Sequence, residues 1–146
     1  MKKAVILLIT VLTAALAFSS CNKKSSVTVN GVSVSEGVYN YYYDIEKNSD
    51  GDKSQQEISD AALSDVATYV AVNSEFKNRA LALSSEDKNI ISQNVNNYWH
   101  VFSEYYKAIG VSKQDIQKIE ESKKYKDAVM ADYYSENGEE PVTDSE

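Results

Sequence analysis

The chain has 146 residues, of which 42% are hydrophobic and 25% charged, a composition typical of one globular domain and not of a disordered chain. Its formal net charge of −7 argues against nucleic acid as a partner, because binding phosphate groups requires a basic face. With one proline and five glycines, there is little in the sequence to interrupt helices.

Residues 1–20 have the layout of a secretory signal peptide and not of folded structure. Lys2 and Lys3 form a basic start. The apolar run from Ala4 to Phe18 is too short to span a membrane comfortably. We therefore expect this segment to be removed after export.

The only cysteine, Cys21, follows directly and has no second cysteine with which to form a disulfide. The order Phe18-Ser19-Ser20-Cys21 resembles a bacterial lipobox, in which the cysteine is lipidated and becomes the new N-terminus. The resemblance implies lipidation at Cys21, with residues 21–26 as a short tether to the extracytoplasmic face of a bacterial membrane. The alternative is ordinary signal cleavage that leaves a free thiol.

The next segment predicts a β-hairpin. Valines alternate with polar residues from Val27 to Val34, the pattern of half-buried strands. Asn30-Gly31 at the centre predicts a type I′ turn. Because an isolated hairpin is not stable in water, we expect it to dock on helices.

Apolar residues then recur at helical spacing in four segments. We expect Ser35 to cap the first helix, which fades into the polar stretch 47–52. The second carries its apolar side from Ile58 to Leu83. Asn73 is the one polar residue on that side, and it would need a hydrogen-bonding partner there.

The third segment lies between Ser84, an expected N-cap answered by Asp87, and Gly110, an expected C-terminal stop. The fourth runs from Lys113 to about Ser135. Because a lone amphipathic helix is marginal in water, we expect the neighbouring helices to cover the apolar stripe of the third segment. That stripe consists of Ile91, Val95, Tyr98, Phe102, Tyr105 and Ile109.

These elements predict a mainly α fold with a small N-terminal β-hairpin, as one helical domain over residues 27–138. An acidic tail over residues 139–146 follows it. Thr143 and Glu146 in this tail have the spacing of a capping box, which would begin a further helix. The alternative is an acidic tail without helical structure.

The order of these motifs resembles the N-terminal region of SurA/PrsA-type extracytoplasmic foldases. The shared motifs are the lipobox at Cys21, the Asn30-Gly31 hairpin, the helix carrying Tyr41-Tyr42-Tyr43, the helix start at Ser84 and the junction Ile109-Gly110-Val111-Ser112. The resemblance implies a helical chaperone module of the SurA N-terminal type, which binds unfolded or extended secreted polypeptides. In the family a parvulin-type peptidyl-prolyl isomerase domain follows this region, and no residues of this chain match it.

The sequence offers no catalytic constellation. Nucleophilic catalysis needs a nucleophile oriented by a base, and the single histidine, His100, falls beside the apolar stripe. The five glycines are scattered singly, and no Cys/His cluster has the spacing of a zinc site. We therefore expect a protein that is not an enzyme and that needs no cofactor.

Residues 46–57 place oxygen-bearing side chains at the ligand positions of an EF-hand loop, with Gly51 at the sharp turn. Glu46 replaces the usual aspartate at the first position, and Lys53 stands where an apolar residue is normal. We therefore expect a polar connector between two helices, with calcium binding as the alternative.

The eleven tyrosines cannot all belong to one core. Residues adjacent in sequence, such as Tyr98 and Trp99, lie on different faces of a helix. Aromatic side chains beyond the needs of the core can line a groove for unfolded chains. The predicted client-binding residues are Tyr41, Tyr42, Tyr98, Trp99, Tyr105 and Tyr106. The alternative function is a small structural or interaction lipoprotein that binds no client.

Overall fold

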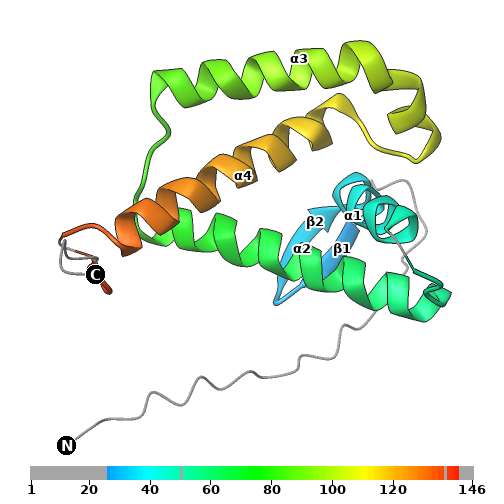
Figure 1. The fold of residues 1–146 in the computed structure, drawn as a ribbon, viewed down its shortest axis with the longest axis horizontal. Helices are drawn as coiled ribbons and strands as arrows, with labels where there is room; N and C mark the ends of the chain where they lie inside the picture. The colour runs from blue at the N-terminus through cyan, green and yellow to red at the C-terminus, as the bar shows by residue number, and fades with distance from the viewer. Residues whose placement is uncertain (1–25, 50, 137, 142–146) are drawn as a thin grey trace, which may run out of the picture.

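The computed structural model describes residues 26–49, 51–136 and 138–141, which form a four-helix domain with an N-terminal hairpin (Figure 1). The predicted mainly α fold is thereby confirmed. The expectations for the signal peptide, Cys21 and the Thr143–Glu146 capping box lie outside the described residues. The elements are β1 (Ser26–Val29), β2 (Val32–Ser35), α1 (Glu36–Asn48), α2 (Gln55–Asn78), α3 (Ser85–Ala108) and α4 (Lys113–Tyr133).

The hairpin forms with the predicted turn. β1 and β2 pair antiparallel, with Val29 opposite Val32. Asn30 and Gly31 have φ values of +50° and +78°, the positive values that a type I′ turn requires at both central positions. Val34 is buried, and this side chain docks the hairpin on the helices as predicted.

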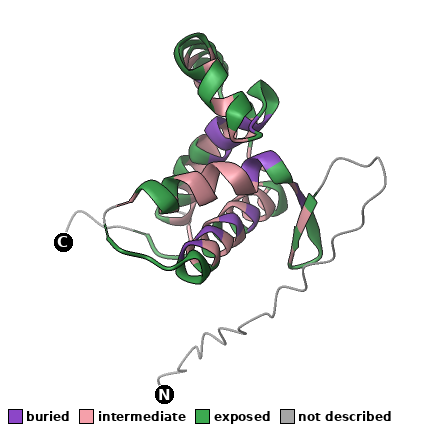
Figure 2. Cartoon of the chain, turned by 90° about the vertical axis from the view of Figure 1, so that its right-hand side faces the viewer, coloured by how far each residue is buried: buried purple, intermediate pink, exposed green. Residues whose placement is uncertain are grey.

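Two hydrophobic cores hold the helices together. The first joins β2, α1, α2 and α4 through Val34, Val38, Val66, Val70 and Ile119. The second joins α3 to the start of α4 through Ile91, Val95, Val111 and Ile116. Figure 2 shows the buried residues gathered where the lower helices meet, whereas α3 at the top is largely exposed. The domain is therefore a packed group of α1, α2 and α4, with α3 added on one side.

The helix starts were predictable from local sequence, with one correction at Ser35. Ser84 accepts a hydrogen bond from the Asp87 amide at 3.0 Å, as expected of an N-cap. Ser35 occupies the N-cap position of α1, but its side chain makes no capping bond there. Its Oγ instead donates to Oδ1 of Asp115 at 2.6 Å. The expected cap is therefore replaced by a link to α4, 80 residues away in sequence.

The second helix ends earlier than its apolar pattern predicts. α2 stops at Asn78, and Ala80 has φ = +52°, a left-handed conformation that turns the chain away. Arg79 fixes this end, because its guanidinium bonds Glu75 at 2.6 Å, Asp132 at 2.8 Å and Glu139 at 2.5 Å. The apolar spacing beyond residue 78 thus continues in a loop and not in a helix.

The polar residue within the apolar side of α2 has the partner that burial demands. Asn73 Nδ2 donates to Oγ of Ser122 on α4 at 2.9 Å, and also to the Tyr69 carbonyl oxygen at 2.7 Å. The predicted need for a hydrogen-bonding partner at this position is confirmed. A similar polar contact joins α3 to α4, where buried Glu120 accepts a bond from Asn94 at 2.9 Å.

Candidate functional site

The apolar stripe of α3 is covered along only part of its length. Ile91 and Val95 are buried in the second core. The exposed fractions are 38% at Tyr98, 48% at Phe102 and 48% at Tyr105. The expectation that neighbouring helices cover the whole stripe is therefore wrong for most of its C-terminal half, at Tyr98, Phe102 and Tyr105, whereas Ile109 at its end packs against the second core.

The position of α4 explains why this half is uncovered. Lys113, the first residue of α4, donates its Nζ to Oδ1 of Asn96 at 2.8 Å. The start of α4 therefore lies opposite the middle of α3, and the rest of α3 extends past it (Figure 1). Gly110, with φ = +76°, ends α3 as predicted and turns the chain back towards that point.

The uncovered residues form one face of the helix. Val101, which is 65% exposed, lies between the aromatic positions. Residues 98, 101, 102 and 105 have the spacing of a single helical face. We call Tyr98, Val101, Phe102 and Tyr105 the α3 aromatic face. Val101 and Phe102 were not among the predicted site residues, although the one-face spacing in the sequence could have identified both.

Tyr106 supports the α3 aromatic face from behind. Its ring stacks on Trp99 with centroids 6.4 Å apart and an angle of 8° between the planes. Phe102 and Tyr105 each meet the same ring edge-on at 6.2 Å. Tyr106 itself is half-buried beside the second core, and burial raises the pKa of its hydroxyl. Predicted residues Trp99 and Tyr106 thus hold the exposed rings in place.

Tyr105 ties the aromatic face to α1. Its hydroxyl donates to Oδ2 of Asp44 at 2.5 Å. This hydrogen bond favours the protonated phenol and raises the pKa of Tyr105. Ile45 follows Asp44 on α1 and is 44% exposed, so α1 also carries an exposed apolar side chain next to the residue that bonds Tyr105.

The two predicted tyrosines of α1 are mainly core residues. Tyr41 packs against both cores, and its ring meets Tyr42 edge-on at 5.5 Å. Burial raises the pKa of both hydroxyls, most strongly that of Tyr42. Tyr42 packs against the first core only, away from α3. The structure therefore gathers all the predicted client-binding residues except Tyr42 around the junction of α1 and α3.

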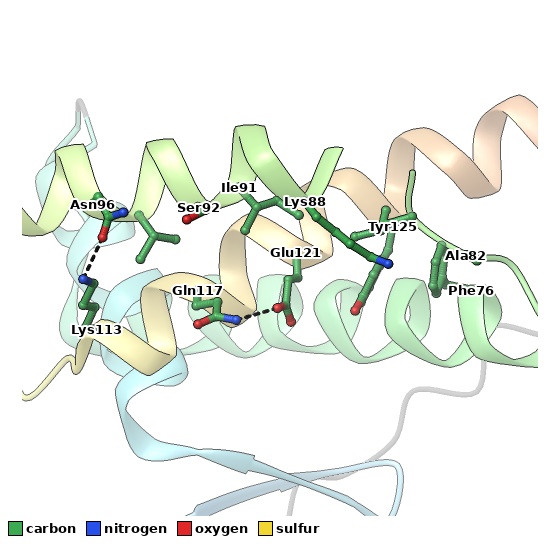
Figure 3. A pocket seen from close by; sticks show the side chains of 12 residues that line it. Phe76, Ala82, Lys88, Ile91, Ser92, Asn96, Lys113, Gln117, Glu121 and Tyr125 are labelled. Atoms are coloured by element: carbon green, nitrogen blue, oxygen red, sulfur yellow. Dashed lines mark hydrogen bonds between the residues drawn. The ribbon is translucent and has the colours of Figure 1, made fainter. Parts of the chain in front are cut away.

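A groove runs between α3 and α4 and has a volume of about 610 Å³ (Figure 3). Ile91 and Val95 contribute apolar surface from α3. Phe76 and Tyr125 close one end as a stacked pair, with ring centroids 4.0 Å apart. The groove was not predictable from the sequence, because its lining comes from α2, α3, α4 and the loop after α2, which only the tertiary packing brings together.

The remaining candidates do not converge on a site. His100 is exposed on α3. In the EF-hand-like segment, the Glu46 carboxylate pairs with Lys53 at 2.6 Å, and Glu57 bonds the hydroxyl of Ser54 at 2.7 Å. Asp50, the central ligand position, lies outside the described residues. Among the residues that the structure describes, no three Asp, Glu, His or Cys side chains are grouped so that they could hold a metal ion.

Comparison with protein-family models, curated proteins and solved structures gives no match to this chain. Within the described part of the chain, none of the helices combines the length and the apolar character needed to cross a membrane. The class of protein defined by the fold is therefore a mainly helical four-helix domain with a two-stranded antiparallel hairpin.

Proposed function

We propose that this chain is a membrane-anchored extracytoplasmic lipoprotein whose helical domain binds unfolded or extended secreted polypeptides. In this proposal it resembles the chaperone module of SurA/PrsA-type foldases. The observation that carries the proposal is the α3 aromatic face, four apolar side chains on one helix that are between 38% and 65% exposed. Contiguous exposed apolar surface of this kind marks interaction sites in soluble domains.

The chemistry of the face suits a partner of variable sequence. Tyr98 combines an apolar ring with a polar hydroxyl, so it can contact both side chains and backbone groups of an extended chain. Tyr105 offers mainly its ring, because its hydroxyl donates to Asp44. The rings project from a regular helix and are supported by Tyr106, which lowers the entropy lost when a chain binds. Few hydrogen-bonding groups line the face, so binding would depend little on client sequence.

The arrangement of the domain also suits a membrane-anchored binder. In both overall views α3 lies at one end of the molecule and the hairpin lies towards the other (Figures 1 and 2). β1 begins at Ser26, five residues after the predicted lipidation site. An anchor attached there would hold the hairpin towards the membrane and leave α3 at the far end of the domain.

The experiment is suppression of aggregation by the processed chain, residues 21–146. We expect it to slow light scattering of an unfolded test protein at micromolar excess. The double variant Val101→Gln/Phe102→Gln should lose most of this protection while keeping its helical circular dichroism. The matched control, Met130→Gln/Tyr134→Gln, removes two other exposed apolar side chains and should protect like the wild type.

Absence of protection by a well-folded wild-type sample would favour the alternative, a small structural lipoprotein without client binding. Equal loss of protection in both double variants would mean that general surface hydrophobicity, and not the α3 aromatic face, is responsible.

A further inference from the structure

The groove between α3 and α4 is a second surface on which a chain could lie, separate from the α3 aromatic face. Its volume of about 610 Å³ falls in the range of small-ligand and peptide sites. The apolar floor at Ile91 and Val95 lies between the two helices, and the stacked Phe76–Tyr125 pair bounds one end. Because Ile91 and Val95 are each only 5% exposed, most of the apolar surface open to a ligand comes from half-buried Phe76, Leu83 and Tyr125.

The charges along the groove alternate in sign. Lys88 lies at the end near Tyr125, and Lys113 lies at the opposite end beside Asn96 (Figure 3). Across the ranges that the structure describes, neither lysine forms a salt bridge, and Lys113 bonds only the neutral Asn96 amide. Glu121 lies between them and accepts a hydrogen bond from Gln117 at 2.9 Å.

This local pattern is opposite to the charge of the whole chain. The formal net charge is −7, yet both ends of the groove carry an ammonium group without a carboxylate partner among the described residues. At physiological salt, charges more than about 8 Å away are largely screened, so the groove's own charges decide which ligand charges bind there: the lysines favour anionic groups at the two ends, and Glu121 disfavours them in the middle.

We propose that the groove binds an extended client segment in which apolar residues are flanked on both sides by aspartate or glutamate. The inference rests on the proposed function and names the chemical class of the client. Lys113 is hydrogen-bonded to Asn96, so the position of Asn96 on α3 marks the second cationic end. Asn96 follows Lys88 by eight residues, and the helical rise of about 1.5 Å per residue therefore separates the two ends by roughly 12 Å. An extended chain advances about 3.3 Å per residue, which places the two acidic residues about four positions apart.

The first test compares two labelled peptides by fluorescence anisotropy with the processed chain at physiological salt. Both peptides share a three-residue apolar centre, and one carries aspartate on each side where the other carries lysine. The aspartate peptide should bind about three- to tenfold more tightly, as expected for two exposed ion pairs. Lys88→Gln/Lys113→Gln should abolish this preference, and Lys88→Glu/Lys113→Glu should reverse it.

A matched pair of lysines controls for general loss of positive charge. Lys47 and Lys126 are exposed and do not line the groove, so Lys47→Gln/Lys126→Gln should keep the full preference for the aspartate peptide. Circular dichroism should show the same helix content in all these variants, because exposed lysines contribute little to folding.

The second test blocks the groove. Ser92 is an exposed residue of the groove wall, whereas its neighbour Gln93 is exposed and does not line it. Ser92→Trp should weaken binding of the aspartate peptide at least about tenfold by occupying the groove, and Gln93→Trp should leave it unchanged.

Equal affinities for the two peptides, no binding of either, or unchanged binding in Ser92→Trp would each overturn the inference. A dimer in sedimentation that Ser92→Trp converts to a monomer would overturn it too, because a second copy would then occupy the groove. The proposed function is tested independently, since aggregation suppression could persist through the α3 aromatic face after any of these results.

Discussion

At the scale of single residues, Asp115 has the most demanding environment in the domain. Its carboxylate is 7% exposed and accepts hydrogen bonds from the Ser112 amide at 3.0 Å, from the Ser112 hydroxyl at 2.5 Å and from Ser35. Gly37 allows this approach, because a Cβ at that position would overlap the carboxylate. One anionic group therefore lies at the start of α1 and of α4, where helix dipoles favour negative charge.

The first prediction concerns Asp115→Asn, which keeps the volume but removes the charge and one acceptor. It should lower the free energy of unfolding by about 1–3 kcal/mol, because the hydrogen bonds from Ser112 and Ser35 lose a charged acceptor and at least one of these part-buried donors loses its partner. Urea denaturation followed by circular dichroism measures this change. A variant as stable as the wild type would show that the carboxylate does not hold the two helix starts together.

Because Asp115 is titratable, we also expect the stability of the domain to depend on pH. Burial acts to raise the pKa of Asp115, but the hydrogen bonds from Ser112 and Ser35 outweigh it and hold the pKa below its ordinary value. The stabilisation is therefore fully present above the unfolded pKa of about 3.9 and is lost as the pH falls through the folded pKa. Thermal unfolding between pH 7 and pH 2 should show a decline below about pH 4 that is smaller in Asp115→Asn.

At the scale of elements, α3 is divided into a packed half and an open half. Val95 is 5% exposed and Val101 is 65% exposed on the same helix. Val95→Ala should reduce the free energy of unfolding by about 2 kcal/mol, because it opens a cavity in the second core. Val101→Ala should change it by less than about 0.5 kcal/mol.

The two variants can be compared directly, because each makes the same Val→Ala change on the same helix. Chemical denaturation of the two variants is the measurement. Equal losses of stability would mean that something covers Val101, which would remove the basis for the α3 aromatic face.

The elements also show what the sequence could and could not predict. Caps and turns are local, so Asn30-Gly31, Ser84 and Gly110 were predictable from their own neighbours. The link from Ser35 to Asp115 was not, because nothing near Ser35 in sequence specifies which distant side chain its hydroxyl will meet.

The candidate site was predictable to a similar extent. Periodicity identified the apolar stripe of α3, and the surplus of aromatics indicated that some would be exposed. Which half stays open depends on where α4 begins. The Ser112–Asp115 capping box starts the helix there, and buried Val111 and Ile116 pack that start against Ile91 and Val95. Tyr41 and Tyr42 could not be assigned from spacing, because both positions on α1 face packed neighbours.

At the scale of the whole molecule, the proposed location depends on residues outside those described. We expect metabolic labelling with a fatty acid to mark the protein, and Cys21→Ala to abolish the label, because the cysteine follows a signal-peptide-like segment. Label that persists in the variant would contradict lipidation at this position. Ser20→Ala is a suitable control, since it keeps the cysteine in place.

The binding proposal concerns the domain as a whole, and the chain contains its own reporter for it. Trp99 is the only tryptophan, and it stacks on Tyr106 behind the α3 aromatic face. A client that covers this face would change the environment of the indole ring. The reporter therefore needs no added label, provided that the client contains no tryptophan.

The most direct measurement is Trp99 fluorescence during titration with such an unfolded client. We expect a saturable blue shift at micromolar concentrations, absent with the same client in its folded state. The shift should be lost in Val101→Gln/Phe102→Gln and kept in Met130→Gln/Tyr134→Gln. An unchanged Trp99 spectrum in a folded sample that nevertheless suppresses aggregation would show that clients bind elsewhere, and would contradict the assignment of the α3 aromatic face.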